Sequence, residues 1–344
     1  MIKILFYDVK PYDIPGFEKF GKERGIAFKF LESHLNHDTA SLTKGYDGIC
    51  AFVNDKIDKE IIDELYQNGI KLIALRSAGF NNVDVKAAFG KIHIYRVPAY
   101  SPYAVAEHAM AMLLTMNRRT HKAYIRTRDY NFSLNGLAGV DLHNKTVGVI
   151  GTGKIGKIFI DICKGFGMNV IAYDKFPNPD YDLEYVELEE LYKRSDFISL
   201  HCPLTEENKH LINKDTIKLM KKGVGIINTS RGGLVNALDL LDGIKERHVG
   251  FACLDVYEEE GDLFFEDRSG HILDDDTLRS LIAMPNVLVT AHQAFLTEEA
   301  LYNIADTTTK NIVDFFNGND NSNEVCYLCG NQENCKRKRK EKCF

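Results

Sequence analysis

The sequence predicts an α/β protein with two doubly wound, Rossmann-like or flavodoxin-like domains, each built on a parallel sheet. Short β-branched apolar runs alternate with amphipathic helical patterns over residues 1–97, and the same alternation starts again at residue 146. At 344 residues, the chain is also longer than a typical domain with a single hydrophobic core. The strand–helix–strand order implies parallel sheets with helices on both faces.

The first domain is expected to contain five strands and two clear helices. The expected strands are Ile2–Tyr7, Ile26–Phe30, Gly48–Phe52, Leu72–Leu75 and His93–Val97. Helices are expected at Pro15–Arg24 and Lys59–Asn68, and Gly69 would end the second of them, as glycine commonly does.

The second domain is expected to begin with a long amphipathic helix from Pro102 to about Thr120. Its six expected strands are Thr146–Ile150, Val170–Tyr173, Phe197–His201, Gly225–Asn228, Phe251–Asp255 and Val287–Thr290. A last helix, Glu298–Phe316, would return the chain to the first domain.

These elements predict three parts of the chain. Residues 1–100 plus 298–323 form one domain, residues 101–297 form a second domain inserted into it, and residues 324–344 form a tail. In open α/β sheets, ligands bind beyond the carboxyl ends of the strands. We therefore expect the active site in the cleft between the two domains.

A glycine motif follows the first strand of the second domain. Gly151, Gly153 and Gly156 stand between this strand and a helical pattern. In a dinucleotide-binding turn, the first glycine makes the tight turn, the second leaves room for a pyrophosphate, and the third lets the helix pack closely on the sheet. Asp174 ends the next strand, 18 residues after Gly156, where a carboxylate would bind a ribose diol and repel a 2′-phosphate. The motif predicts NAD rather than NADP; the alternative is an ordinary α/β turn without a nucleotide.

Three polar residues follow later strands of the same sheet. Arg231 could clamp a carboxylate, Glu260 could hydrogen-bond an imidazole and favour its charged form, and His292 could exchange a proton. For each residue taken singly there is an alternative: a surface arginine, a solvated acid or a structural histidine. Together with a nicotinamide cofactor they predict hydride transfer to a carbonyl, with His292 as the acid and no metal required.

The composition excludes several other classes of protein. The net charge of −6 gives no reason to expect nucleic-acid binding, and no apolar run reaches the ~18 residues of a membrane span. The N-terminus enters a strand pattern directly, without a signal-peptide pattern, so a cytoplasmic location is expected. Four of the eight cysteines lie singly in apolar runs and are expected to be buried: Cys50, Cys163, Cys202 and Cys253.

Longer motifs add a family resemblance. The stretches that carry it are Phe52–Asp55, Ala74–Asp84, Val97–Pro102, Val105–His108, Gly148–Gly156, Ser199–Leu204, Asn228–Gly232, Leu254–Glu258, Asp262–Asp267 and His292–Thr297. Through them, residues 1–320 resemble the D-isomer-specific 2-hydroxyacid dehydrogenases, and among these the fermentative bacterial D-lactate dehydrogenases.

The resemblance implies that the first domain binds substrate, the second binds NAD, and Arg231, Glu260 and His292 are catalytic. The implied cofactor contacts, besides the motif glycines and Asp174, are Lys154, Ile155, Cys202, Pro203, Asn208, Thr229, Ser230, Arg231 and Asp255. The implied substrate contacts are Phe52, Val53, Arg76, Gly79, Tyr100, Arg231, His292 and Phe295. It also implies a homodimer or homotetramer, with the long helix after Pro102 in the interface.

The bulk of Phe52, with Tyr100 and Phe295, would leave room for little more than a methyl group beside the carbonyl. Pyruvate is therefore the expected substrate and D-lactate the product. Two alternatives stay open: a dehydrogenase for larger 2-oxo acids such as 2-oxoisocaproate or phenylpyruvate, and a non-enzymatic, NAD-sensing interaction protein.

The family pattern ends near Asn323, before a basic segment that contains Cys326, Cys329, Cys335 and Cys343. Four thiolates could hold zinc, but their spacing matches no common zinc site. We expect a flexible basic tail, with a zinc clip as the weaker alternative.

Overall fold

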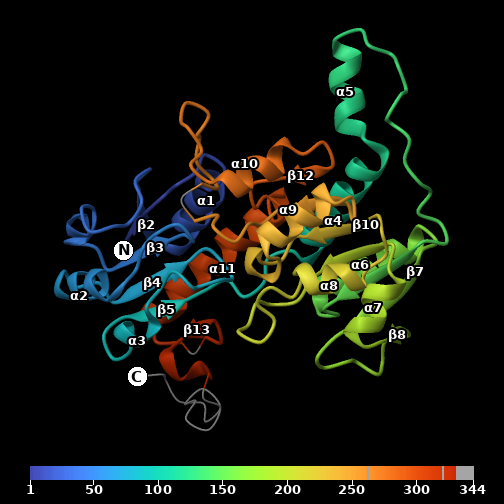
Figure 1. The fold of residues 1–344 in the computed structure, drawn as a ribbon. Helices are drawn as coiled ribbons and strands as arrows, with labels where there is room; N and C mark the ends of the chain where they lie inside the picture. Colours follow the sequence, from blue (N-terminus) through green and yellow to red (C-terminus); the bar gives the residue numbers. More distant parts are fainter. Residues whose placement is uncertain (262, 320, 331–344) are drawn as a thin grey trace. The chain divides into compact units, whose positions relative to one another are not determined.

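The computed structural model describes residues 1–261, 263–319 and 321–330. The chain divides into two compact units. Unit 1 contains Met1–Ser101 and the chain from Leu296 onward, and unit 2 contains Pro102–Phe295 (Figure 1). The boundaries predicted above lie after residues 100 and 297. In the part of the chain that the structure describes, no helix is both long and apolar enough to cross a membrane.

Unit 1 is built on a six-stranded sheet with the order β13-β5-β4-β3-β1-β2. The strands are β1 (Ile2–Phe6), β2 (Ile26–Phe30), β3 (Gly48–Ala51), β4 (Leu72–Leu75), β5 (His93–Tyr95) and β13 (Glu324–Val325). The first five are parallel in the flavodoxin-like order 2-1-3-4-5, and β13 pairs antiparallel with β5.

The helices of unit 1 are α1 (Ile14–Arg24), α2 (Lys59–Gln67), α3 (Val85–Ala88) and α11 (Glu298–Asn317), with 3₁₀ turns η1 (Ala40–Thr43) and η3 (Tyr327–Gly330). Local signals explain their ends. Gly25, with φ of 70°, ends α1 in the left-handed conformation, and the Asp58 side chain caps α2 by accepting the Ile61 N–H. Every residue of β3 and β4 is buried, as expected for central strands covered on both faces.

Unit 2 is built on a seven-stranded parallel sheet with the order β12-β11-β10-β9-β6-β7-β8. The strands are β6 (Thr146–Ile150), β7 (Asn169–Tyr173), β8 (Glu184–Tyr185), β9 (Phe197–Leu200), β10 (Val224–Asn228), β11 (Val249–Leu254) and β12 (Val287–Val289). The strand order reverses between β6 and β9, which is the ligand-binding point of a Rossmann fold. The predicted fold class is confirmed.

The helices of unit 2 are α4 (Pro102–Arg118), α5 (Thr120–Arg128), α6 (Lys154–Gly165), α7 (Leu188–Arg194), α8 (Lys214–Leu219), α9 (Ala237–Lys245) and α10 (Asp276–Ala283), with the 3₁₀ turn η2 (Gly232–Leu234). The single helix predicted over Pro102–Thr120 ends earlier. Arg119, with φ of 52°, separates α4 from α5. In Figure 1, α5 and the chain after it extend away from the sheet of unit 2.

The tail was predicted to start at residue 324, but residues 324 and 325 still belong to the sheet of unit 1. Glu324 and Val325 form β13, and Glu324 Oε1 lies 2.7 Å from His93 Nδ1. Pairing with β5 and burial of Val325 hold this segment to the sheet edge. Cys326 is buried, whereas Cys335, Cys343 and the side chain of Cys329 lie outside the described residues.

Candidate active site

The glycine turn after β6 has the geometry of a phosphate cradle. Gly151 has φ of 98°, and a Cβ there would lie 2.6 Å from the His201 carbonyl carbon. A Cβ at Gly153, the N-cap of α6, would meet no atom within 4 Å, so this backbone faces open space that a ligand can enter. The free N–H groups at the start of α6 suit a phosphate.

Gly156 lies in close contact with residues that directly follow two strands of the sheet. A Cβ at this position would lie 1.9 Å from the Gly151 carbonyl oxygen. It would also lie 3.4 Å from His201 Cβ, directly after β9, so the missing Cβ lets α6 pack closely on the end of the sheet. Only glycine fits here without moving the turn.

Asp174 follows β7 and is anchored to the glycine turn. Its Oδ2 accepts the Thr152 N–H at 2.7 Å and the Thr152 hydroxyl at 3.0 Å, and its Oδ1 accepts the Phe176 N–H at 2.8 Å. An ionised carboxylate has about four acceptor positions, so these bonds leave one for a ribose hydroxyl. The residues of this turn therefore fit NAD.

Other predicted cofactor residues gather where β9 and β10 end. The Ser230 hydroxyl donates to the Cys202 carbonyl at 2.6 Å, and the Asn208 amide donates to the Pro203 carbonyl at 2.8 Å. Thr229, which precedes Ser230 in the chain, is buried. The structure thus brings together four predicted residues from two separate connections; their contacts with a cofactor remain predictions.

Arg231 is placed by the backbone around it. The Asn228 side chain bonds the Arg231 carbonyl at 2.9 Å and the Ser230 N–H at 3.1 Å, which shapes the turn after β10. A Cβ on Gly232 would lie 2.0 Å from the Tyr257 carbonyl carbon. The absence of that Cβ lets the Arg231 turn pack directly on the backbone that leads to Glu260.

Glu260 and His292 form the hydrogen-bonded pair expected from the sequence. Glu260 Oε1 lies 2.9 Å from His292 Nδ1, and Glu260 Oε2 accepts the Tyr257 N–H at 3.0 Å. Both side chains are about a quarter exposed, at 25% and 23%. His292 has φ of 52°, and its N–H donates to the Asp255 carbonyl at 2.7 Å.

Asp255 also has a structural role, which the sequence pattern does not indicate. It is fully buried, and its carboxylate accepts the Thr290 hydroxyl at 2.6 Å and the N–H groups of Gln293 and Ala294, each at 2.9 Å. His108 Nε2 lies 3.4 Å from the same carboxylate. These bonds hold the loop that carries His292 in its left-handed turn. His108 lies in one of the motifs quoted above, but nothing in the local pattern indicates this partner.

The predicted substrate residues of unit 1 lie after its strands. Phe52 and Val53 follow β3, and Arg76 and Gly79 follow β4. The Tyr100 carbonyl accepts a hydrogen bond from Asn303 at 2.7 Å. Arg76 is only 2% exposed, which favours an indirect role over direct contact with a substrate.

Phe295, the last predicted substrate residue, ends unit 2. Its ring centroid lies 6.4 Å from that of Phe265, which in turn lies 5.9 Å from the His292 ring. The structure thus places an aromatic pair next to the His292 imidazole.

A Rossmann sheet with this glycine turn, an aspartate at the end of the next strand and a carboxylate–imidazole pair after later strands defines a nicotinamide-dependent dehydrogenase. Comparison with known proteins agrees. Residues 110–294 match the family model for the D-isomer specific 2-hydroxyacid dehydrogenase, NAD binding domain. A 2-hydroxyacid dehydrogenase homolog of Haemophilus influenzae is 50% identical over 316 residues, which are 90% of this chain and 95% of that protein.

Two further relatives have more specific names. D-lactate dehydrogenase of Escherichia coli is 47% identical over 94% of this chain and 100% of its own length. The structure described as the pyruvate reductase of Chlamydomonas reinhardtii is similar with a TM-score of 0.90, at 44% identity, over 94% of this chain and 98% of that one. The chain belongs to the D-isomer-specific 2-hydroxyacid dehydrogenase family, and its cofactor is NAD.

Proposed function

We propose that this enzyme reduces pyruvate to D-lactate with NADH, and catalyses the reverse reaction. The hydrogen-bonded pair of Glu260 and His292 carries the proposal, because it supplies the proton exchange that a 2-hydroxy acid dehydrogenase needs. The names of the similar proteins from Escherichia coli and Chlamydomonas reinhardtii support the choice of pyruvate.

His292 would act through Nε2. An ionised Glu260 can only accept a hydrogen bond, so His292 Nδ1 carries a hydrogen and donates it to Glu260. Nε2 is then the nitrogen that gives a proton to the substrate oxygen during reduction and takes it back during oxidation. Glu260 is itself held by the Tyr257 N–H, which orients the imidazole.

Arg231 would bind the substrate carboxylate through its planar guanidinium and polarise the neighbouring carbonyl. Its Nη1 donates to the Ser230 carbonyl at 2.7 Å, which leaves other N–H groups of the fork for a ligand. When bound, NADH supplies the hydride, and the protein contributes orientation and charge.

Substrate size is proposed to depend on Phe52, together with Tyr100 and Phe295. A fixed aromatic ring at Phe52 would disfavour substituents larger than a methyl group. Discrimination by an apolar pocket is worth about 1–3 kcal/mol for each methylene, so we expect a graded preference. The alternative is an enzyme that prefers 2-oxoisocaproate or phenylpyruvate.

We also propose a homodimer or homotetramer. The segment after α5 carries large apolar side chains that are strongly exposed within this chain, namely Tyr130 (85%), Phe132 (71%) and Leu134 (80%). Apolar groups gathered in this way are typical of protein–protein interfaces. A cytoplasmic location is proposed as well, because Cys50, Cys163, Cys202 and Cys253 are free thiols.

The test is a steady-state assay of NADH oxidation with pyruvate, 2-oxobutyrate, 2-oxoisocaproate and phenylpyruvate. The proposal predicts the highest kcat/KM for pyruvate and, by chiral chromatography, D-lactate as the product. A higher kcat/KM for 2-oxoisocaproate or phenylpyruvate would support the alternative substrate class. Binding of NADH without turnover of any 2-oxo acid would instead favour an NAD-sensing interaction protein.

A further inference from the structure

Phe52 is fixed at three points within unit 1. Its N–H donates to Asp55 Oδ2 at 2.6 Å, and its carbonyl accepts the Asn82 amide at 2.8 Å. The guanidinium carbon of Arg76 lies 4.0 Å from the centroid of the Phe52 ring. The two hydrogen bonds fix the backbone, and the contact with Arg76 is the one of the three that involves the ring.

Arg76 is held more firmly than a typical cation–π partner. Its side chain is 2% exposed, its Nε lies 3.4 Å from Asp13 Oδ2, and its Nη2 donates to the Asp8 carbonyl. Its guanidinium carbon also lies 5.0 Å from the Phe6 ring centroid. A buried guanidinium needs counter-ions and polarisable neighbours. The counter-ions are Asp13 and Asp8, whose Oδ2 lies 3.9 Å from Nη2, and the neighbours are the two aromatic rings.

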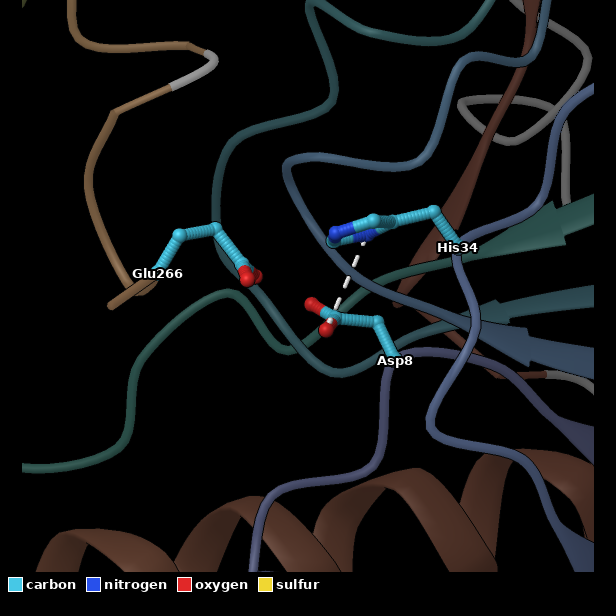
Figure 2. A group of neighbouring side chains, drawn as sticks. All are labelled: Asp8, His34 and Glu266. Carbon is cyan, nitrogen blue, oxygen red and sulfur yellow. Dashed lines mark ion pairs between the residues drawn. The ribbon is translucent and has the colours of Figure 1, made fainter. Parts of the chain in front are cut away.

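Asp8 and Asp13, which contact Arg76, are in turn fixed by their own hydrogen bonds and ion pairs. Asp13 Oδ2 accepts the Lys10 N–H at 3.0 Å, so the carboxylate that faces Arg76 is fixed from the backbone. Asp8 is fully buried; its Oδ1 lies 2.7 Å from Lys10 Nζ and 3.6 Å from His34 Nδ1, the ion pair drawn in Figure 2. Hydrogen bonds and ion pairs thus connect Arg76, which follows β4, to Asp8, which follows β1 on the other side of β3.

We propose that Arg76 is a positioning residue for substrate size: it holds the Phe52 ring in the one orientation that limits the space beside the reacting carbonyl. The inference rests on the proposed function, in which Phe52 is the size limit. A ring free to change its χ1 angle would turn aside for a larger substrate. A ring held by a buried guanidinium loses that contact whenever it turns, and larger 2-oxo acids are rejected more strongly.

The test compares two rates in one protein preparation. The selectivity ratio is the kcat/KM for 2-oxoisocaproate divided by the kcat/KM for pyruvate, each with saturating NADH. Partial unfolding lowers both rates by the same factor and cancels in the ratio. Arg76→Met, which keeps the length of the side chain and removes its charge, should raise the ratio about 5- to 30-fold, the range of a desolvated cation–π contact.

Arg24→Met is the matched control. Arg24 also lies over a phenylalanine of unit 1, 4.8 Å from the Phe20 ring, and it pairs with Asp306 of α11. Its loss should lower stability without changing the selectivity ratio. Asp13→Asn, which removes the nearer of the two counter-ions of Arg76, should raise the ratio in the same direction as Arg76→Met and serves as the test if Arg76→Met does not fold.

A double-mutant cycle shows whether Arg76 acts through Phe52. Phe52→Ala should raise the ratio by itself, and Arg76→Met added to Phe52→Ala should change it no further. An unchanged ratio in Arg76→Met or in its substitute Asp13→Asn, or an equal change with and without Phe52, would overturn the inference. Wild-type preference for 2-oxoisocaproate would overturn the choice of pyruvate alone, because the change caused by Arg76→Met would still decide the role of Arg76.

Discussion

In both sheets, charged residues lie beyond the carboxyl ends of the parallel strands. The two units differ strongly in how far these residues are exposed. In unit 1, Asp8, Asp55 and Arg76 are 0–2% exposed and bonded to neighbouring backbone or side chains. In unit 2, the side chains of Glu260 and His292 remain about a quarter exposed. Buried charges must be satisfied internally and become rigid, whereas a group that exchanges protons must remain accessible.

The comparison predicts that charge removal has different consequences in the two units. In unit 2 it should abolish chemistry and leave the fold intact. In unit 1 it should weaken the fold or alter selectivity.

The largest effect is expected for His292→Gln, which removes the nitrogen that we propose to exchange the proton. The kcat/KM for pyruvate should fall by about 10²- to 10⁴-fold, the usual contribution of a general acid. The melting temperature should stay near that of the wild type, because Asp255 holds this loop largely through backbone groups. His271→Gln, at an exposed position of the same unit, should have no effect on either quantity. Retention of a tenth of the wild-type rate by His292→Gln would contradict the assignment.

A smaller effect, on stability, is expected for Asp55→Asn. Asp55 accepts the N–H groups of Leu35 and Phe52, each at 2.6 Å, and an amide can accept only one of them. Leaving one buried N–H unpaired should cost about 1–3 kcal/mol in the free energy of unfolding by urea. Asp84→Asn is the control, because this exposed residue caps α3 and asparagine caps equally well.

Asp55 also predicts a dependence of stability on pH. Burial raises the pKa of this carboxyl from 3.8 to about 6. The folded state therefore holds the proton more tightly than the unfolded state, and this contribution to stability is present below about pH 4 and is lost as the pH rises to about 6. The difference in unfolding free energy between the wild type and Asp55→Asn should change over that interval. A difference that is constant with pH would show that Asp55 does not titrate there.

The smallest effect is expected for Asp174→Asn, which keeps an acceptor for Thr152 and removes the charge near the ribose. The ratio of kcat/KM for NADPH to that for NADH should rise about tenfold, since repulsion of a 2′-phosphate is relieved. Asp180→Asn, an exposed acid in the same connection, should leave the ratio unchanged. Equal use of both cofactors by the wild type would remove Asp174 as the cause of the preference.

Much of the fold and part of the site follow from local sequence patterns. The apolar runs of the strands, the proline at the first position of α4 and the glycines after strands each impose a local backbone requirement that can be recognised in the sequence. The pairing of Glu260 with His292 was also predictable, because parallel strands bring their carboxyl ends to one edge of a sheet.

Other features depend on residues distant in sequence, and only the tertiary structure decided them. Arg76 meets Asp13 across 63 positions, and Asp255 holds the His292 loop through contacts 35 to 39 positions away. The first residues of the expected tail form β13, because they pair with β5 at the edge of the sheet. The sequence by itself determined which residues stand at the strand ends, since local patterns specify strands. Packing between distant segments decided which of those residues are buried and support others, and which remain accessible. A local sequence pattern does not contain this information.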